Sequence, residues 1–340
     1  MVLTLRPLET KGPSIGGTDS LRTVYGPVPS RRLGRSLGVS PIPRKTCTYS
    51  CVYCQLGRTS TLTTQRRSFF PKEDVVGEIA SSLPDSGAEY ITFAGDGEPT
   101  LCKDLGWLVG QCKAQFGIPV AVITNGSLLD RPQVRADLME ADVVMPSLDA
   151  GSAALFRRIN RPHKSVTYDK VLEGLVAFRR EYHGRLWVEV MLVRGLNDSP
   201  ESLDDLKHAL DRVAPDQVHL TMPIRPPAEK WVQMPAPSSV HAARDILGRG
   251  HEVVGYESGT FGTSAPARPE EAIMEICLRH PLREEQAEQI AQRLGAPDVV
   301  ASLVAAGELM RVAHAGKHYL IASGPSGAPL SHPQDEEPSV

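Results

Sequence analysis

The sequence is poor in cysteine and has no long hydrophobic run. Six cysteines among 340 residues are too few for a disulfide scaffold. No apolar run approaches the ~18 residues of a membrane span. The first residues also lack the charged, apolar and small-residue segments that follow one another in a secretory signal. These absences exclude a disulfide-rich secreted domain and a membrane helix. We therefore expect a cytoplasmic protein in a reducing compartment, with no membrane partner.

Acidic residues are absent between Ser20 and Lys72, although the net charge of the whole chain is only -3. This stretch holds ten basic residues: Arg22, Arg31, Arg32, Arg35, Arg44, Lys45, Arg58, Arg66, Arg67 and Lys72. One interpretation is an ordinary solvated surface. The other is a positive field that favours an anionic cluster and an anionic substrate, and it predicts that residues 22–72 bind RNA.

Short runs typical of β-strands alternate with segments whose apolar residues recur at helical spacing. The expected strands are Leu37–Val39, Tyr90–Phe93, Pro119–Thr124, Val143–Ser147, Leu186–Val193 and Gln217–Thr221. Strands separated by crossovers predict a parallel sheet, and right-handed crossovers tend to curl it. We expect an α/β fold, a partial (β/α)6 barrel like a TIM barrel. An open, doubly wound sheet is the competing architecture.

The domain boundaries follow from changes in composition. Residues 1–23 lack apolar periodicity and predict a mobile lead-in, and residues 24–262 predict the main domain. Three short helical patterns and a hairpin pattern at 266–323 predict a winged helix-turn-helix domain, which would dock nucleic acid or protein. Residues 324–340 are rich in proline, serine and acid and predict a disordered tail.

Three of the six cysteines, Cys47, Cys51 and Cys54, stand within eight residues, spaced C-x3-C-x2-C. Three thiolates on one loop can hold three irons of a cubane and leave the fourth iron without a protein ligand. A zinc knot needs a fourth ligand, but no histidine precedes His163. A disulfide with one spare thiol is the remaining alternative.

This loop, with Tyr53 directly before the last cysteine, resembles the signature loop of the radical S-adenosylmethionine (radical SAM) superfamily. The resemblance implies a [4Fe-4S] cluster, S-adenosylmethionine (SAM) as cofactor, and an enzyme that cleaves SAM to a 5'-deoxyadenosyl radical. It also implies a flavodoxin- or ferredoxin-like electron donor. The alternative without catalysis is a nucleic-acid-binding regulator stabilised by a metal.

Further candidates stand at the ends of the expected strands, which converge at the mouth of a barrel. Gly95 and Gly97 would let a ligand approach the backbone, and Glu98 would accept a bond from the ammonium group of SAM. Ser147 and Asp149 resemble positions that contact the ribose, although a helix cap is an equal use for them. The resemblance adds Tyr53, Asn125 and Glu189 as cofactor contacts, with a surface-facing Glu189 as the alternative.

A closer resemblance is to the group related to wyosine-type tRNA-modifying radical SAM enzymes. It is carried by Gly26–Gly38, Lys45–Thr59 and Ile159–Pro162, and it covers roughly residues 24–262. It implies tRNA or other RNA as substrate, with a peptide or small molecule as the alternative. The wyosine-forming enzymes use a second cluster with upstream cysteines, and no cysteine precedes Cys47 here. The resemblance therefore does not extend to the tricyclic-base reaction.

Overall fold

The structure is a computed structural model that describes residues 22–84, 86–248, 252–253, 255, 259, 261–262 and 268–323. The predicted lead-in lies outside the described residues up to position 21, and the predicted tail lies wholly outside them. No helix in the described ranges combines the length and the apolar character needed to cross a membrane.

An eight-stranded sheet forms the centre of the larger domain. Its strands lie in the order β1 (Val24–Ser30), β2 (Gly34–Val39), β5 (Tyr90–Phe93), β6 (Val120–Thr124), β7 (Val143–Pro146), β8 (Arg185–Met191), β9 (Gln217–Thr221) and β10 (Glu252–Val253). The strand β1 pairs antiparallel with β2, and every later pair of neighbours is parallel. All six expected strands are present. The strand β1 was not expected, because it contains Pro27 and Pro29, which a sheet tolerates at an edge.

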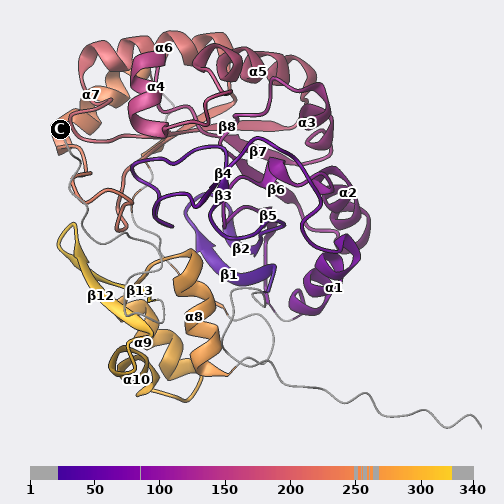
Figure 1. Ribbon diagram of the computed structural model, residues 1–340, viewed down its shortest axis with the longest axis vertical. Helices are drawn as coiled ribbons and strands as arrows, with labels where there is room; N and C mark the ends of the chain where they lie inside the picture. The colour runs from indigo at the N-terminus through magenta and orange to yellow at the C-terminus, as the bar shows by residue number, and fades with distance from the viewer. Residues whose placement is uncertain are drawn as a thin grey trace, which may run out of the picture.

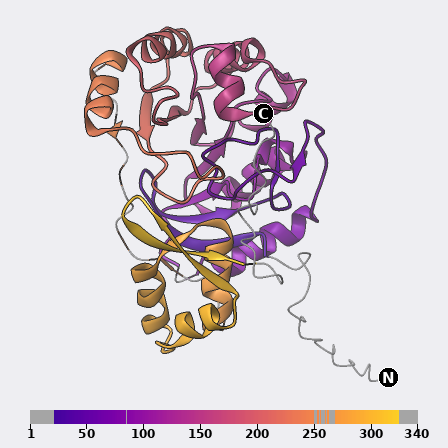
Figure 2. The same ribbon diagram turned by 60° about the vertical axis from the view of Figure 1, so that its left-hand side comes forward.

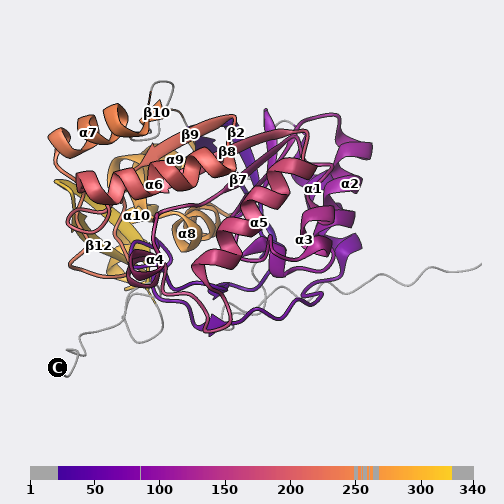
Figure 3. The ribbon, with the colours of Figure 1, turned by 90° about the horizontal axis from the view of Figure 1, so that it is seen from above.

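From β2 onward the strands follow one another in chain order, without the reversal that defines a doubly wound sheet. Figure 1 shows an outer arc of helices around the strands. The arc contains α1 (Lys72–Ser82), α2 (Leu105–Phe116), α3 (Pro132–Asp137), α5 (Tyr168–Glu181) and α6 (Pro200–Val213). The helices α4 (Ala153–Asn160) and α7 (Pro237–Leu247) lie near α6 in Figure 1 and are seen from above in Figure 3. Helices on the outer side of a parallel sheet in sequential order are consistent with a partial barrel.

The helices form where capping and apolar spacing agree. The helix α6 begins after Ser199, whose hydroxyl accepts a hydrogen bond from the Ser202 amide at 3.3 Å, and Pro200 occupies its first turn. Leucines at 203, 206 and 210 then share the buried face. This start was predicted from the residues Ser199-Pro200-Glu201.

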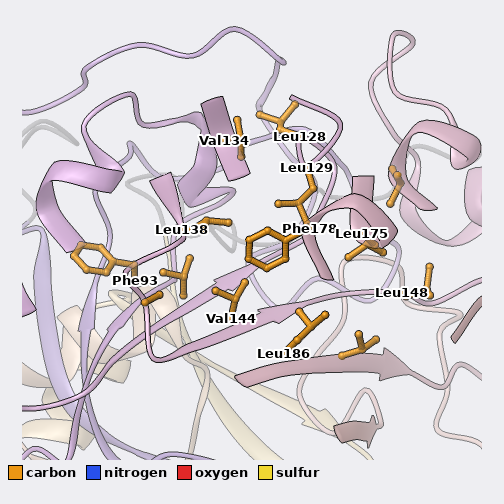
Figure 4. Close-up of a cluster of buried hydrophobic side chains, with 14 of the residues drawn as sticks. Phe93, Leu128, Leu129, Val134, Leu138, Val144, Leu148, Leu175, Phe178 and Leu186 are labelled. Atoms are coloured by element: carbon orange, nitrogen blue, oxygen red, sulfur yellow. The ribbon is translucent and has the colours of Figure 1, made fainter. Parts of the chain in front are cut away.

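The main hydrophobic core lies between the sheet and the outer helices. Figure 4 shows Leu175 and Phe178 of α5 close to Val144 of β7 and Leu186 of β8. All four side chains are inaccessible to solvent. Burying a side chain of this size contributes about 1.5–3 kcal/mol, so these contacts fix α5 against the strands whose ends carry the site.

Residues 268–323, the C-terminal segment, have a core of their own. Its elements are α8 (Pro269–Arg279), β11 (Leu282–Arg283), α9 (Glu284–Arg293), α10 (Val299–Ala305), β12 (Leu309–His314) and β13 (Lys317–Ala322). The three strands pair antiparallel in the order β11-β13-β12. The segment packs beside the amino-terminal hairpin (Figure 2), and Val28 of β1 contacts its core.

Candidate functional site

Residues 47–54 form the cysteine loop, which follows β2 and begins in the short strand β3 (Thr46–Cys47), paired with β4 (Thr61–Leu62). All three cysteines are half-buried free thiols. Backbone hydrogen bonds from Ser50 and Val52 end on the carbonyls of Asn160 and Ile159, at 3.1 and 2.9 Å. The end of α4 therefore sets the shape of the loop.

Two asparagines direct side-chain amides at cysteine sulfurs. Asn125 Nδ2 lies 3.5 Å from Cys47 Sγ, and Asn160 Nδ2 lies 3.6 Å from Cys51 Sγ. The backbone amide of Tyr49 also donates to Cys47 Sγ, at 3.5 Å. Hydrogen bonds to sulfur stabilise thiolates and tune the potential of an iron–sulfur cluster. Asn160 was not predicted, although it stands in the Ile159–Pro162 motif that carried the family resemblance.

The donor set fits a cubane better than a single ion. Among the described residues, no group of three or more His, Cys, Asp or Glu side chains is arranged to hold one metal ion, as a zinc knot requires. In a cubane each thiolate binds a different iron. Burial raises the pKa of Cys47 to about 12 and raises the pKa values of Cys51 and Cys54. A thiol loses its proton when its sulfur binds a metal, even where burial has raised its pKa.

The glycine turn, residues 95–97, packs directly on the chain that leads into the cysteine loop. A Cβ on Gly97 would lie 1.9 Å from the carbonyl oxygen of Thr46, and Gly95 has a φ of 110°. The two glycines were predicted to admit a ligand to the backbone. Gly97 also approaches the protein's own backbone closely, which joins the turn to the chain before the cysteine loop, and the approach of a ligand to the two glycines stays a prediction.

Glu98 is a hub of hydrogen bonds and is 1% exposed. Its carboxylate accepts bonds from Thr100 N (3.0 Å), Thr100 Oγ1 (2.6 Å), Thr124 Oγ1 (2.5 Å) and Asn125 N (2.7 Å). Burial raises its pKa, although these donors oppose the shift. The carboxylate thus connects the end of β6 to the glycine turn. Asn125, which it binds, in turn contacts the sulfur of Cys47. Its predicted contact with an ammonium group stays a prediction.

Asp149 is a second hub. Its carboxylate accepts bonds from Tyr53 Oη at 2.5 Å, Asn160 Nδ2 at 2.7 Å and Met191 N at 2.9 Å. Burial raises the pKa of Asp149, against the effect of these donors. Tyr53 and Asp149, both predicted to bind the cofactor, therefore bind each other, and they join the cysteine loop to the end of β7.

Ser147, directly after β7, and Glu189, in β8, are neighbours across a parallel β-bridge. The Glu189 carboxylate forms an ion pair with Arg32, and both side chains are largely buried. Burial alone would raise the pKa of Glu189, but the charges of Arg32 and Arg31 and the hydrogen bond from Arg32 act together against it, and the pKa is lowered. Glu189 is thus not a surface residue. Contacts of Ser147 and Glu189 with the cofactor stay predictions.

The basic residues of the stretch 22–72 were interpreted as a positive field toward an anionic substrate. Four of them contact groups of the protein itself, and the side chains of Arg32 and Arg66 are largely buried, while binding of an anionic substrate by the stretch stays a prediction. Arg32 pairs with Glu189, Arg66 with Asp137 and Arg58 with Glu229, and Arg35 donates to the Ser86 carbonyl. Their partners lie 51–171 residues away in sequence, so no local pattern reveals them.

A different basic surface adjoins the cysteine loop, and we call it the α4 basic face. Phe156 of α4 packs edge-on against Tyr49 of the loop, with ring centroids 5.4 Å apart. On the outer side of the same helix Arg157 and Arg158 are exposed, and exposed Lys164 follows. The run Arg157–Lys164 was not singled out from sequence, although five of its eight residues are Arg, Lys or His.

Comparison with known proteins agrees with this site. The family model of the radical SAM superfamily matches residues 42–206, which include the cysteine loop and both carboxylate hubs. A UPF0026 protein of Methanocaldococcus jannaschii is 38% identical over 306 residues, covering 86% of this chain and 94% of the relative. A UPF0026 protein of Synechocystis is 38% identical over 204 residues, covering 60% of this chain and 76% of the relative.

Among solved structures, a radical SAM methyltransferase from Sphaerobacter thermophilus has a similar fold. The TM-score is 0.50 at 19% sequence identity, and the match covers 64% of this chain and 65% of that one. This similarity concerns the fold alone. The family model and the relatives lead to one assignment: residues 42–206 form a domain of the radical SAM superfamily, whose cofactors are a [4Fe-4S] cluster and SAM, and the chain belongs to the UPF0026 family.

Proposed function

We propose that this protein uses Cys47, Cys51 and Cys54 to hold a [4Fe-4S] cluster for reductive cleavage of SAM. When bound, the cluster and SAM supply a 5'-deoxyadenosyl radical that removes a hydrogen atom from the substrate. The observation that carries the proposal is the set of three thiols on one loop, with amide donors at two of their sulfurs. A reductant of the flavodoxin or ferredoxin type would supply the electron.

The predicted cofactor residues divide into two sets under this proposal. Tyr53, Glu98, Asn125 and Asp149 hold the cysteine loop and two strand ends in place through the bonds described above. Ser147, Glu189 and the backbone of the glycine turn would contact SAM itself. The first set orients the site and the second binds the cofactor, so their variants should differ in stability.

We further propose that the substrate is RNA, as the resemblance to wyosine-type enzymes suggests. The α4 basic face supports this proposal better than residues 22–72 do. Its exposed guanidinium groups lie on the helix that packs on the cysteine loop, and the ammonium group of Lys164 follows shortly after that helix. Phosphates are the usual partners of such groups. RNA held there would lie beside the site of radical formation.

For the C-terminal segment we propose a winged helix-turn-helix that docks a protein. Its element order, a helix, a strand, two helices and a hairpin, supports the first part. Its charge supports the docking of a protein and not of a nucleic acid, because residues 268–323 contain six Lys and Arg against eight Asp and Glu. The helix α10 has the sequence VVASLVA and carries no basic side chain for phosphate contact.

The test is anaerobic reconstitution with iron and sulfide, followed by reduction in the presence of SAM. We expect about four irons per chain, slow release of 5'-deoxyadenosine without substrate, and faster release when the substrate RNA is added. Stoichiometric zinc without sulfide would overturn the cluster assignment. Stimulation by peptides and not by any RNA would overturn the RNA proposal alone.

A further inference from the structure

The last residue of α8, Arg279, extends from the C-terminal segment into the larger domain. Its Nε donates to Asp96 Oδ2 at 3.0 Å, and the two side chains are 3% and 4% exposed. Its Nη2 donates to the carbonyl of Arg22 at 2.5 Å, and its guanidinium lies 5.0 Å from the ring centre of Tyr25. One arginine therefore makes a buried ion pair across the two domains.

The partner of Arg279 stands at the centre of the glycine turn. The carbonyl of Asp96 accepts a hydrogen bond from the Lys45 amide at 2.6 Å, and its own amide donates to Ser40 Oγ at 3.3 Å. The glycines on either side leave the turn little intrinsic preference for one conformation. The ion pair thus restrains the side chain of Asp96 in a turn that also contacts the residues just before Cys47.

The same helix end holds the other side of the site. Gln55, directly after Cys54, donates from Nε2 to the carbonyl of Arg279 at 2.9 Å. Arg225 donates to Gln55 Oε1 at 3.0 Å. The side chain of Arg279 therefore restrains the glycine turn, and its backbone restrains the exit of the cysteine loop.

We infer that Arg279 is a positioning residue for SAM: through Asp96 it holds the glycine turn in the conformation that binds the cofactor, so the C-terminal segment is part of the SAM site. The inference rests on the proposed function, in which this turn contacts SAM. Without the guanidinium, the Asp96 carboxylate would be buried without its cationic partner, and the glycine-flanked turn would rotate it toward water. The cysteines keep their other restraints, so the cluster should remain.

The experiment compares full-length Arg279→Met and Arg279→Lys proteins with the wild type after anaerobic reconstitution. Three quantities are measured: iron content, the dissociation constant for SAM by equilibrium dialysis, and amide hydrogen exchange at residues 93–101 without SAM. Arg279→Met should keep its iron, bind SAM about tenfold more weakly and exchange faster in the turn. Arg279→Lys should recover part of the affinity, because it keeps the charge.

Tyr319→Phe is the matched control. The Tyr319 hydroxyl donates to the Ile224 carbonyl at 2.6 Å, so this variant removes a different contact between the C-terminal segment and the larger domain. Its SAM affinity should equal that of the wild type. If the control weakens SAM binding as much as Arg279→Met, the effect is general undocking and the inference is wrong.

A second variant covers the case in which Arg279→Met does not fold. Asp96→Asn removes the charge of the other partner with little change in shape, and it should weaken SAM binding and speed exchange in the turn in the same way. Wild-type affinity and unchanged exchange in the folded variants would overturn the inference alone. If the wild type with its full cluster bound no SAM, the proposed function would fail, and the inference with it.

Discussion

The carboxylate of Asp149 and the side-chain amide of Asn160 lie 2.7 Å apart, which joins the end of β7 to the end of α4. The same amide also lies 3.6 Å from Cys51 Sγ, and the same carboxylate accepts the hydroxyl of Tyr53. The pair thus connects two elements of the barrel to the loop that carries the cysteines. Its role can be separated from that of the cluster ligands by substitution.

Replacing Asp149 by Ala should destabilise the protein strongly, because three buried donors lose their acceptor. Each unsatisfied group costs about 1–3 kcal/mol, so we expect a loss of about 3 kcal/mol or more in the free energy of unfolding. Tyr53→Phe removes only one bond and should cost about 1 kcal/mol. Urea denaturation measures both changes, and iron content reports whether the loop still assembles.

Tyr182→Phe provides the control for this pair of variants. Its buried hydroxyl donates to the Ala141 carbonyl at 2.8 Å, away from the site. It should lower stability about as much as Tyr53→Phe without changing the iron content or the affinity for SAM. An Asp149→Ala protein as stable as the wild type would contradict the hub assignment.

Changing Cys51 to Ala should abolish the cluster, since three thiolates are the minimum for this ligation. Cys112→Ala is the control, because Cys112 is buried inside α2 and serves as a core residue. Anaerobic iron and sulfide determination should give about four of each in the control protein and far less in Cys51→Ala. Full iron in Cys51→Ala would remove this residue from the ligand set.

Glu98→Ala tests whether this carboxylate is structural. The hydroxyl of Thr124 and the amide of Asn125 would lose their acceptor inside the protein, and Asn125 would then no longer be held beside Cys47. We expect a loss of about 3 kcal/mol in the free energy of unfolding and partial loss of iron. Weak SAM binding with unchanged stability and iron would instead favour the originally predicted contact with the ammonium group.

The sequence predicted the sheet well because its strands are continuous apolar runs separated by helical patterns. It did not predict β1, because the two prolines of this edge strand are atypical of a strand. It also could not predict which side chains pair across the fold. Arg279 has no local signal at all, since its partner Asp96 lies 183 residues away. The three cysteines were recognisable because their chemistry is encoded by spacing, whereas hubs such as Asp149 depend on distant donors.

His219 should make the stability of the protein depend on pH. Burial and the charge of Arg32 lower the pKa of His219 to about 4, below the ordinary value of 6.5. Between these values the unfolded chain binds a proton that the folded protein does not, so stability falls as the pH falls from 6.5 toward 4. The slope is at most about 1.4 kcal/mol per pH unit.

Urea midpoints between pH 7 and pH 5 measure this dependence, in a range where most carboxylates remain ionised. His219→Gln removes the titrating group and should flatten the curve. If the wild type and the variant lost stability in parallel, another group would be responsible for the acid sensitivity.

The RNA proposal predicts a salt dependence that originates in the α4 basic face. If Arg157 and Arg158 contact phosphates, the affinity for RNA falls steeply with salt, and Arg157→Ala/Arg158→Ala should reduce the logarithmic slope by about 0.7–0.9 for each lost contact. Lys207→Ala/Arg212→Ala on α6 removes the same charge elsewhere and should leave the slope unchanged. Arg32→Ala should lower stability, because it leaves Glu189 buried without its partner, and should change the slope little. RNA binding that is insensitive to salt, or equally affected by both double variants, would contradict the assignment and favour a peptide or small-molecule substrate.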